Sequence, residues 1–320
     1  MRAEMPFPHV PDEETFFEYF AKQDELWRPA VEELLEAERV AHTPSALARL
    51  SGGSNILYAL DDERILKIFP PITIEEFETE CALLESLNRT DLGQPVPPLY
   101  ERGVYDGWGW CVIGRLDGML GRKVWDDIPF KDRERLVAEA GEWMAATWAS
   151  EVFQATELPE VRASWSAAQK KFRGELHQKH QRRKTTPEHL AEIEALMSDW
   201  QPRDEAVIIH ADLHLGNMLF LEQAGRWEIS GILDFADGLA APRIYDLSTP
   251  LLSLTRGHPK LTEILYHHTF GPNHGIDAKL MTQWILLHRF FHIPYTLERD
   301  WVPDDCATIE QLGRVMSGLS

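Results

Sequence analysis

The chain has 320 residues, of which 44% are hydrophobic and 26% charged, a composition typical of a globular protein long enough for two domains. Its 32 Lys and Arg side chains are outnumbered by 52 Asp and Glu side chains, so the formal net charge is −20. A nucleic acid polymer is not expected as a partner, because binding to a polyanion requires a basic face.

Three cysteines, Cys81, Cys111 and Cys306, are scattered along the chain without a C-x-x-C pair. We expect reduced thiols here rather than a disulfide or zinc framework. The N-terminus lacks the apolar segment of a signal peptide, and no run approaches the roughly 18 apolar residues of a membrane-spanning helix. These features predict a cytoplasmic protein without a membrane partner, which we expect to be a monomer or a weak dimer.

The first part of the chain combines one helical segment with a set of short strands. Residues 12–40 carry aromatic and aliphatic side chains at helical spacing, which predicts a helical N-terminal extension of about residues 1–43. Alternating apolar segments separated by turn residues then predict a small antiparallel sheet around one helix. The five strands are expected at residues 46–50, 56–60, 64–69, 100–104 and 108–113, and the helix at residues 74–87.

Beyond Asp117-Gly118 the sequence becomes mainly helical. Helices are predicted at residues 131–148, 163–184, 187–200, 260–270 and 278–291. The helix at 163–184 carries a basic run, which we interpret as a solvated helix face. The chain is thus expected to be an α+β protein with two lobes, a small N-terminal β-sheet lobe (residues 1–116) and a larger helical lobe (residues 117–320).

Two apolar strands in the second lobe each lead into polar residues. Val207-Ile208-Ile209 precedes His210-Ala211-Asp212, with Asn217 five residues after Asp212, and Ile232-Leu233 precedes Asp234. Phosphoryl transfer from a nucleotide requires a carboxylate that orients the attacking hydroxyl, together with oxygen ligands for Mg²⁺. We therefore predict Asp212 as the catalytic base and Asn217 and Asp234 as the metal ligands. An isolated Asp of this kind would otherwise be a turn or cap residue.

A lysine in the first lobe has the features of a nucleotide contact. Lys67 is the only charge within Ile65–Phe69, and Glu80 lies on the apolar stripe of the following helix, three residues after Phe77. A carboxylate buried there requires a cation, and Lys67 is the nearest candidate in chain order. The pair would hold the α- and β-phosphates of a nucleotide. The alternative is an edge-strand lysine that extends to water.

Two backbone segments complete the expected nucleotide site. The turn at residues 51–55, including Ser54 and Asn55, would cover the phosphates with backbone N–H groups, although a plain hairpin turn fits it nearly as well. The hinge that contains Gly114 and Leu116 would present backbone groups to the base.

The segments from His210 to Asn217, Asp234-Phe235 and Tyr245-Asp246-Leu247 together resemble the aminoglycoside phosphotransferase and choline kinase-like family, which has the protein-kinase fold. The resemblance implies ATP or GTP as co-substrate, Mg²⁺, and phosphorylation of a small-molecule hydroxyl. The usual family pattern is His-Gly-Asp-Leu-His-Pro-Gly-Asn, and here Ala211 replaces the first Gly and Leu215 the Pro. Ala211 also stands where protein kinases have an Arg, so a protein substrate is disfavoured.

The acceptor is expected to be a small hydroxylated molecule, with an aminoglycoside-type antibiotic as the leading hypothesis. A cationic acceptor would favour carboxylates and aromatic groups near the C-terminal helices, where the family places this site. The candidates are Asp237, Glu298, Asp300, Trp301, Asp304 and Asp305. One alternative is a kinase for a metabolite such as choline, homoserine, a sugar or an amino sugar. Another is a non-catalytic nucleotide-binding protein, which is disfavoured because Asp212, Asn217 and Asp234 are all present.

Overall fold

The computed structural model describes residues 7–12, 15–16, 23–50, 55–150, 165–203 and 205–319. The chain divides into two compact units, which we call unit 1 (residues 1–91 and 95–117) and unit 2 (residues 92–94 and 118–320).

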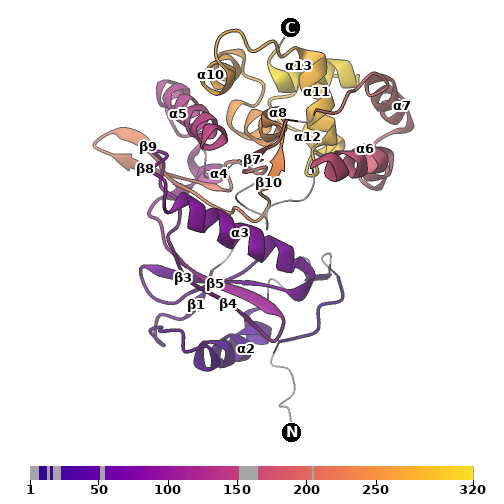
Figure 1. Cartoon of the computed structure of the whole chain (residues 1–320). Coiled ribbons are helices and arrows are strands. Elements are labelled where there is room, and N and C mark those ends of the chain that lie inside the picture. The colour runs from indigo at the N-terminus through magenta and orange to yellow at the C-terminus, as the bar shows by residue number, and fades with distance from the viewer. Residues whose placement is uncertain are drawn as a thin grey trace. The chain divides into compact units, whose positions relative to one another are not determined.

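Unit 1 is built on a five-stranded antiparallel sheet with the strand order β1-β2-β3-β5-β4 (Figure 1). Its strands are Ala48–Arg49 (β1), Ile56–Ala59 (β2), Arg64–Phe69 (β3), Leu99–Tyr105 (β4) and Trp108–Gly114 (β5). Strand β3 ends at Pro70-Pro71, since proline has no N–H for the ladder. A short 3₁₀ turn (η2, Pro71–Thr73) then leads into helix α3 (Ile74–Leu87). The strands and the helix expected from the sequence of this region are present.

One face of this sheet is covered by the N-terminal segment. Side chains alternate between the two faces along each strand, so Tyr58, Ile68 and Trp108 lie in one hydrophobic core. Helix α2 (Asp24–Ala37) adds Trp27 and Leu34 to that core, and both are fully buried. The N-terminal extension therefore gives the sheet a second buried face.

The opposite face of the sheet packs against α3. Gly109 on β5 lies under Phe77, and a Cβ added at this glycine would come within 2.5 Å of the Phe77 ring. Phe69 packs beside the same ring, with 5.7 Å between the ring centroids. The absence of a side chain at Gly109 thus lets the helix lie close to the sheet.

Unit 2 contains a three-stranded sheet with the order β6-β8-β9 and a two-stranded sheet of β7 and β10. Its strands are Met119–Leu120 (β6), Val207–Ile209 (β7), Met218–Gln223 (β8), Arg226–Ile232 (β9) and Leu239–Ala241 (β10). Strand β8 pairs with β9, and β10 returns to pair with β7. Both loops that follow a motif strand, residues 210–217 and 233–238, therefore start and end on paired strands.

Helices form the rest of unit 2 (Figure 1). They are Gly121–Val124 (α4), Phe130–Ala149 (α5), Trp165–Arg182 (α6), Pro187–Leu196 (α7), Arg243–Asp246 (α8), Ser248–Pro250 (α9), the π-helix Leu251–Thr255 (η5), Pro259–Phe270 (α10), Ala278–Leu287 (α11), Ile293–Leu297 (α12) and Ile309–Ser317 (α13). Helix α5 packs against α10, and α11 against α13. Within the described ranges, no helix combines the length and the apolar character that a membrane crossing requires.

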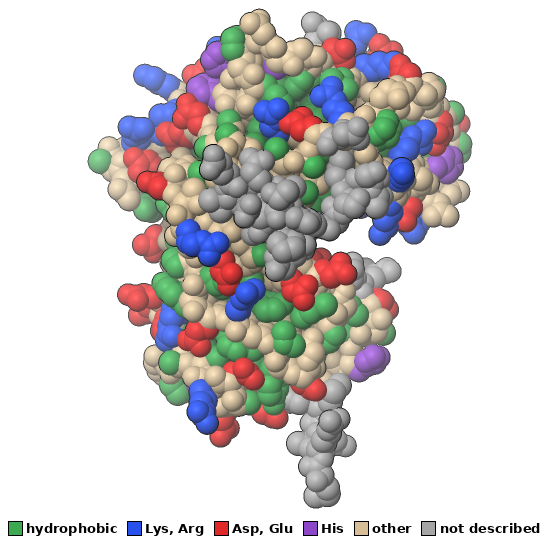
Figure 2. Space-filling view, in the orientation of Figure 1, with side chains coloured by type: hydrophobic (Ala, Val, Ile, Leu, Met, Phe, Trp, Pro, Cys, Tyr) green, Lys and Arg blue, Asp and Glu red, His purple; other side chains and the backbone are tan. Residues whose placement is uncertain are grey.

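On the face of each unit in view, acidic and basic side chains are interspersed (Figure 2). The expected α+β class, with an antiparallel sheet followed by a mainly helical part, is confirmed by this set of elements.

Candidate active site

The loop between β7 and β8 carries Asp212 and has an unusual backbone at its second residue. Ala211 adopts a left-handed conformation, with φ of +63°. Such a conformation costs an L-residue roughly 1–2 kcal/mol, so the surrounding structure must hold it in place. The backbone N–H of Ala211 donates to Asp246 Oδ1 over 2.7 Å, and its carbonyl accepts from His288 Nε2 over 2.9 Å.

Asp246 and His288 are both buried, with 1% of each residue exposed. The second oxygen of Asp246 accepts from Trp148 Nε1 over 2.9 Å, so neither carboxylate oxygen faces solvent. Burial raises the pKa of Asp246 and lowers the pKa of His288 to about 3. Asp246 is thus a structural carboxylate, as its sequence context indicates, whereas His288 was not anticipated.

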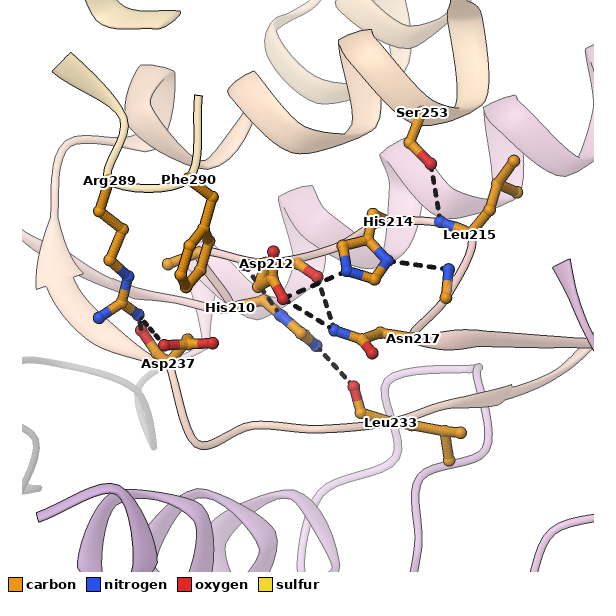
Figure 3. Close-up of polar contacts among 12 residues, drawn as sticks. His210, Asp212, His214, Leu215, Asn217, Leu233, Asp237, Ser253, Arg289 and Phe290 are labelled. Atoms are coloured by element: carbon orange, nitrogen blue, oxygen red, sulfur yellow. Dashed lines mark hydrogen bonds and ion pairs between the residues drawn. The ribbon is translucent and has the colours of Figure 1, made fainter. Parts of the chain in front are cut away.

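His210 connects the two motif loops. Its Nε2 donates to the carbonyl of Leu233 over 3.0 Å, and its Nδ1 accepts from the backbone N–H of Asp212 over 3.2 Å (Figure 3). The ring is buried and packs beside Phe235, with 4.8 Å between the ring centroids. Both ring nitrogens are therefore engaged with backbone groups, so this histidine fixes the loops in place.

The carboxylate of Asp212 is oriented by two neighbours of its own loop (Figure 3). Asn217 Nδ2 donates both to the Asp212 carbonyl and to Asp212 Oδ2, over 3.0 Å in each case. His214 Nε2 lies 3.4 Å from the same carboxylate oxygen. The Asp212 side chain is 14% exposed, so it is partly shielded but reachable.

His214 is held between Asp212 and Gly216. Its Nδ1 accepts from the Gly216 N–H over 2.8 Å, and a Cβ at Gly216 would come within 2.5 Å of its ring. Burial lowers the pKa of His214, but the hydrogen bond to Asp212 and the carboxylates of Asp212 and Asp234 outweigh it, and the pKa is raised. The ring therefore serves as a donor to Asp212.

Asn217 and Asp234 lie at adjacent positions where β8 begins and β9 ends. The N–H of Leu233 donates to the carbonyl of Asn217 over 2.8 Å, which joins the two loops directly. Asp234 has a φ of +64°, a conformation that Asp tolerates better than most residues. The amide nitrogen of Asn217 points to Asp212, so its oxygen faces the other way (Figure 3).

The residues fit a Mg²⁺ ion that also binds a nucleotide. Asn217 would supply a neutral oxygen and Asp234 a charged one, and Mg²⁺ in phosphoryl-transfer sites commonly takes one or two carboxylates besides phosphate oxygens and water. Among the described residues, no group of three or more His, Cys, Asp and Glu side chains is arranged as a complete metal cage. Two side-chain oxygens of this kind suit a Mg²⁺ ion that takes its other ligands from phosphate and water.

Asp237 lies beside this centre but pairs with a cation. Arg289 contacts Asp237 Oδ1 over 2.5 Å and also donates to the Asp237 carbonyl over 2.6 Å. Burial raises the pKa of Asp237 to about 6, against the opposing effect of Arg289, and the carboxylates of Asp212 and Asp234 add to the rise.

A cavity of about 730 Å³ in unit 2 includes Asp212 in its lining. Three of the predicted acceptor residues, Glu298, Asp300 and Trp301, also line it, whereas Asp237, Asp304 and Asp305 do not. Phe290 and Tyr295, which are 47% and 57% exposed, add aromatic surface.

The cavity also contains residues that the sequence analysis missed. Arg122, Arg256 and Arg299 line it, together with Ser253, whose hydroxyl accepts from the Leu215 N–H over 2.8 Å. No local motif marks these residues, because they come from α4, the end of η5 and the segment after α12. The spacing of the motif around Asp212 therefore does not predict which distant residues line the cavity.

In unit 1, Lys67 and Glu80 form an ion pair with 2.5 Å between Nζ and Oε2. Both are buried, with 5% and 1% of each residue exposed. The pair forms because Lys67 points to the sheet face under α3, while Glu80 lies on the side of α3 that faces the sheet. The Lys67 ammonium also lies 5.0 Å from the centre of the Phe69 ring.

The structure describes three of the four residues that were predicted to contact the nucleotide through the backbone or a turn, namely Gly114, Leu116 and Asn55. The N–H groups of Gly114 and Arg115 donate to Pro98 and Glu63 over 2.7 Å each, so they are already engaged within unit 1. Leu116 is half-buried, and Asn55 is buried, with no hydrogen-bond partner for its Oδ1 in the described structure. Ser54 lies outside the described residues.

The interpretation of the basic run on α6 as a solvated face is wrong for two of its members. Lys179 donates to the carbonyls of Leu286 and His288 over 2.6 and 2.9 Å, and Arg183 donates to that of Arg289 over 2.9 Å. These carbonyls lie at and just beyond the C-terminal end of α11, where helical partners are missing. The two cations thus hold the segment that carries His288 and Arg289.

A model of the phosphotransferase enzyme family (APH) matches residues 45–270, more than half of the chain. The chain belongs to the phosphotransferase enzyme family. This membership confirms the resemblance seen in the motifs and the expected enzyme class, a small-molecule O-phosphotransferase. A search of curated proteins finds no match.

Solved structures show the same fold at low sequence identity. A GDP complex of an aminoglycoside 2'-phosphotransferase-IIIa variant matches with a TM-score of 0.66 and 16% identity, over 80% of this chain and 86% of that one. An aminoglycoside-3'-phosphotransferase of type VIII gives 0.59 and 17%, over 81% and 98%. A mutant of aminoglycoside phosphotransferase APH(4)-Ia with AMP-PNP and hygromycin B gives 0.58 and 14%, over 90% and 98%. The expected protein-kinase-like fold of this phosphotransferase is thereby confirmed.

Proposed function

We propose that this phosphotransferase moves the γ-phosphate of ATP or GTP to a hydroxyl group of a small molecule in a Mg²⁺-dependent reaction. The observation that carries the proposal is the Asp212 carboxylate, which lines a cavity of about 730 Å³ and is oriented by Asn217 and His214. A cavity of this size accommodates a small molecule. The solved neighbours bind GDP, ATP or AMP-PNP, which supports a nucleotide as co-substrate.

In this proposal Asp212 orients the acceptor hydroxyl and accepts its proton as the oxygen attacks the γ-phosphorus. The bond between the γ-phosphorus and the β,γ-bridging oxygen breaks, and the nucleoside diphosphate leaves. Asn217 and His214 donate to Asp212 and fix the direction of its free lone pairs. Asn217 and Asp234 would hold Mg²⁺, which neutralises charge on the phosphate oxygens when it is bound. Lys67, aligned by Glu80, would hold the α- and β-phosphates, while Gly114, Leu116 and the turn with Ser54 and Asn55 remain candidates for the other nucleotide contacts.

The test is nucleotide turnover by the purified protein with and without Mg²⁺, for the unsubstituted chain and for Asp212→Ala and Asp234→Ala. We expect Asp212→Ala to lower turnover by about 10²-fold or more, because general base catalysis contributes that much. Asp234→Ala should abolish the Mg²⁺-dependent part. The exposed Glu228→Gln on β9 removes a carboxylate outside the site and should change neither. Turnover that survives Asp212→Ala unchanged would favour a non-catalytic nucleotide-binding protein.

An aminoglycoside is the first acceptor class to test, because aminoglycosides are bound in several neighbours and because Glu298, Asp300 and Trp301 line the cavity. A panel of aminoglycosides that gives neither phosphorylation nor binding above background would remove the antibiotic hypothesis and leave the kinase proposal intact.

A metabolite kinase is the second candidate function. The observation that favours it is the set of arginines in the same cavity, because a polycationic antibiotic would meet like charges there.

A further inference from the structure

We propose that the acceptor carries an anionic group, a carboxylate or a phosphate, in addition to its hydroxyl, and that Arg299 and Arg122 bind this group in the cavity that contains Asp212. The inference rests on the proposed phosphotransfer at Asp212, because it concerns the other substrate of that same site. It names a substrate class opposite in charge to a polycationic antibiotic.

All three arginines line the cavity that contains Asp212, and two of them, Arg122 and Arg256, are also linked to the Asp212 loop. The N–H of Arg122 donates to the carbonyl of Leu215 over 2.9 Å, so Arg122 flanks the loop that carries Asp212. Ser253 holds Leu215 from another side and accepts Arg256 Nε at its own carbonyl over 3.3 Å. Because Arg122 and Arg299 line the same cavity of about 730 Å³ as Asp212, one small molecule could contact them and Asp212 together.

The arginines differ in whether an acid already neutralises them. Arg256 pairs with Asp126 over 2.7 Å, and both line the cavity. In the part of the chain that the structure describes, neither Arg122 nor Arg299 has a carboxylate within ion-pair distance. Two guanidinium groups are thus available to a ligand.

The planar guanidinium group of Arg299 is held in a position that suits binding of an anion at its edge. Its guanidinium carbon lies 3.6 Å from the centre of the Tyr295 ring, so the ring supports one face of the group. The N–H groups at the edge stay free to donate a paired set of bonds to a carboxylate or a phosphate. Partial burial and the neighbouring Arg256 lower the pKa of Arg299 although Asp300 acts in the opposite direction, and an anion bound in the cavity would favour the charged guanidinium.

The carboxylates of the cavity do not reverse this conclusion. Asp126 is neutralised by Arg256, and Asp212 is engaged by Asn217 and His214. Glu298 and Asp300 also line the cavity, and both are exposed. Their carboxylates could therefore bind one ammonium group of an acceptor that also carries an anion. A molecule with many ammonium groups and no anion would be repelled by Arg122 and Arg299, and the exposed Glu298 and Asp300 would offset only part of that repulsion.

The test uses four hydroxylated probes with one carbon skeleton, namely glucose, glucosamine, gluconate and glucose 6-phosphate. Their binding to the full-length protein is measured by calorimetry in the presence of Mg²⁺ and a non-hydrolysable nucleotide. We expect gluconate or glucose 6-phosphate to bind at least tenfold more tightly than glucose and glucosamine, and the better of the two identifies the anion. Arg299→Gln should remove this preference, and Arg299→Lys should restore only part of it, because Lys lacks the planar fork.

Arg182→Gln is the matched control, since Arg182 is an exposed cation of α6 that does not line the cavity. It should leave the preference unchanged, and the thermal midpoint of each variant shows that the fold is retained. Equal binding of all four probes, tighter binding of glucosamine, or a preference that persists in Arg299→Gln with Arg122→Gln would overturn the inference. Mg²⁺-dependent nucleotide turnover that requires Asp212, measured in parallel, reports on the proposed function separately.

Discussion

His288 donates from Nε2 to the carbonyl of Ala211, over 2.9 Å and across 77 residues of sequence. Together with Asp246, which accepts from the Ala211 N–H, it holds both polar groups of a left-handed residue directly before Asp212. The direction of the Asp212 side chain follows from this backbone. Two buried side chains therefore hold the backbone from which the proposed base projects.

Replacing His288 by Ala should lower both stability and turnover. It leaves the Ala211 carbonyl buried without this donor, which costs about 1–3 kcal/mol. We expect kcat to fall while the KM for the nucleotide stays within about twofold, because the Asp212 loop is displaced and the nucleotide contacts of unit 1 are untouched. Denaturant unfolding and steady-state kinetics measure the two effects. His288→Gln, whose amide can still donate, should recover part of the kcat, and equal loss in both variants would contradict a positioning role.

The same histidine makes stability depend on pH. Burial lowers the pKa of His288 to about 3, whereas a histidine in the unfolded chain titrates near 6.5. Below about pH 6.5 the unfolded state therefore binds a proton that the folded state does not, and the free energy of unfolding falls as the pH drops. The slope from this group is at most about 1.4 kcal/mol per pH unit. The free energy of unfolding is measured between about pH 6.5 and 5, at the onset of this titration. It should fall more steeply with decreasing pH in the unsubstituted protein than in His288→Gln.

The left-handed backbone of Ala211 predicts how the stability of the protein ranks among variants at this position. Gly removes the left-handed strain of roughly 1–2 kcal/mol, but it adds unfolded-state entropy of about 0.4–1 kcal/mol and leaves a small gap. We expect the stability of Ala211→Gly to lie within about 1 kcal/mol of the original. Ala211→Val places a branched side chain at positive φ in a fully buried position, and should cost at least about 2 kcal/mol. Thermal unfolding of the two variants decides this, and a Val variant as stable as the Gly variant would exclude the left-handed backbone.

The contrast between these residues and the motif residues shows what the sequence could predict. Asp212, Asn217 and Asp234 follow apolar strands at short range, so their gathering could be inferred from local patterns. Lys67 and Glu80 could be paired because strand and helix periodicity each specify a face. His288, Ser253 and Arg122 contact the Asp212 loop from elements that are distant in sequence. Arg256 and Arg299 join them in lining the cavity, and no periodicity encodes such an arrangement.

The Lys67–Glu80 pair predicts strong non-additivity. Lys67→Met leaves Glu80 as a buried carboxylate without this partner, and Glu80→Leu leaves Lys67 in the same condition, at a cost of roughly 3–5 kcal/mol each. The double variant should lose less stability than either single variant, while nucleotide turnover stays impaired because Lys67 is absent. Unfolding free energies of the four proteins in this cycle test the coupling. Glu85→Gln breaks the exposed pair with Arg102 and should cost no more than about 1 kcal/mol.

Lys179 is expected to make the free energy of unfolding depend on pH in the alkaline range. Its ammonium group donates to the carbonyls of Leu286 and His288 in a partly buried contact, and burial lowers its pKa to about 7. Between about pH 7 and the value near 10.4 of an unfolded lysine, the unfolded state holds a proton that the folded state has lost, so the free energy of unfolding rises with pH. This contribution is at most about 1.4 kcal/mol per pH unit and should vanish in Lys179→Met. Unfolding measured from pH 7.5 to 9, roughly the middle of this window, compares the two slopes. The exposed Lys171 is the control, since Lys171→Met should keep the slope of the unsubstituted protein. Identical slopes in all three proteins would mean that Lys179 is solvated, as the helix pattern alone indicates.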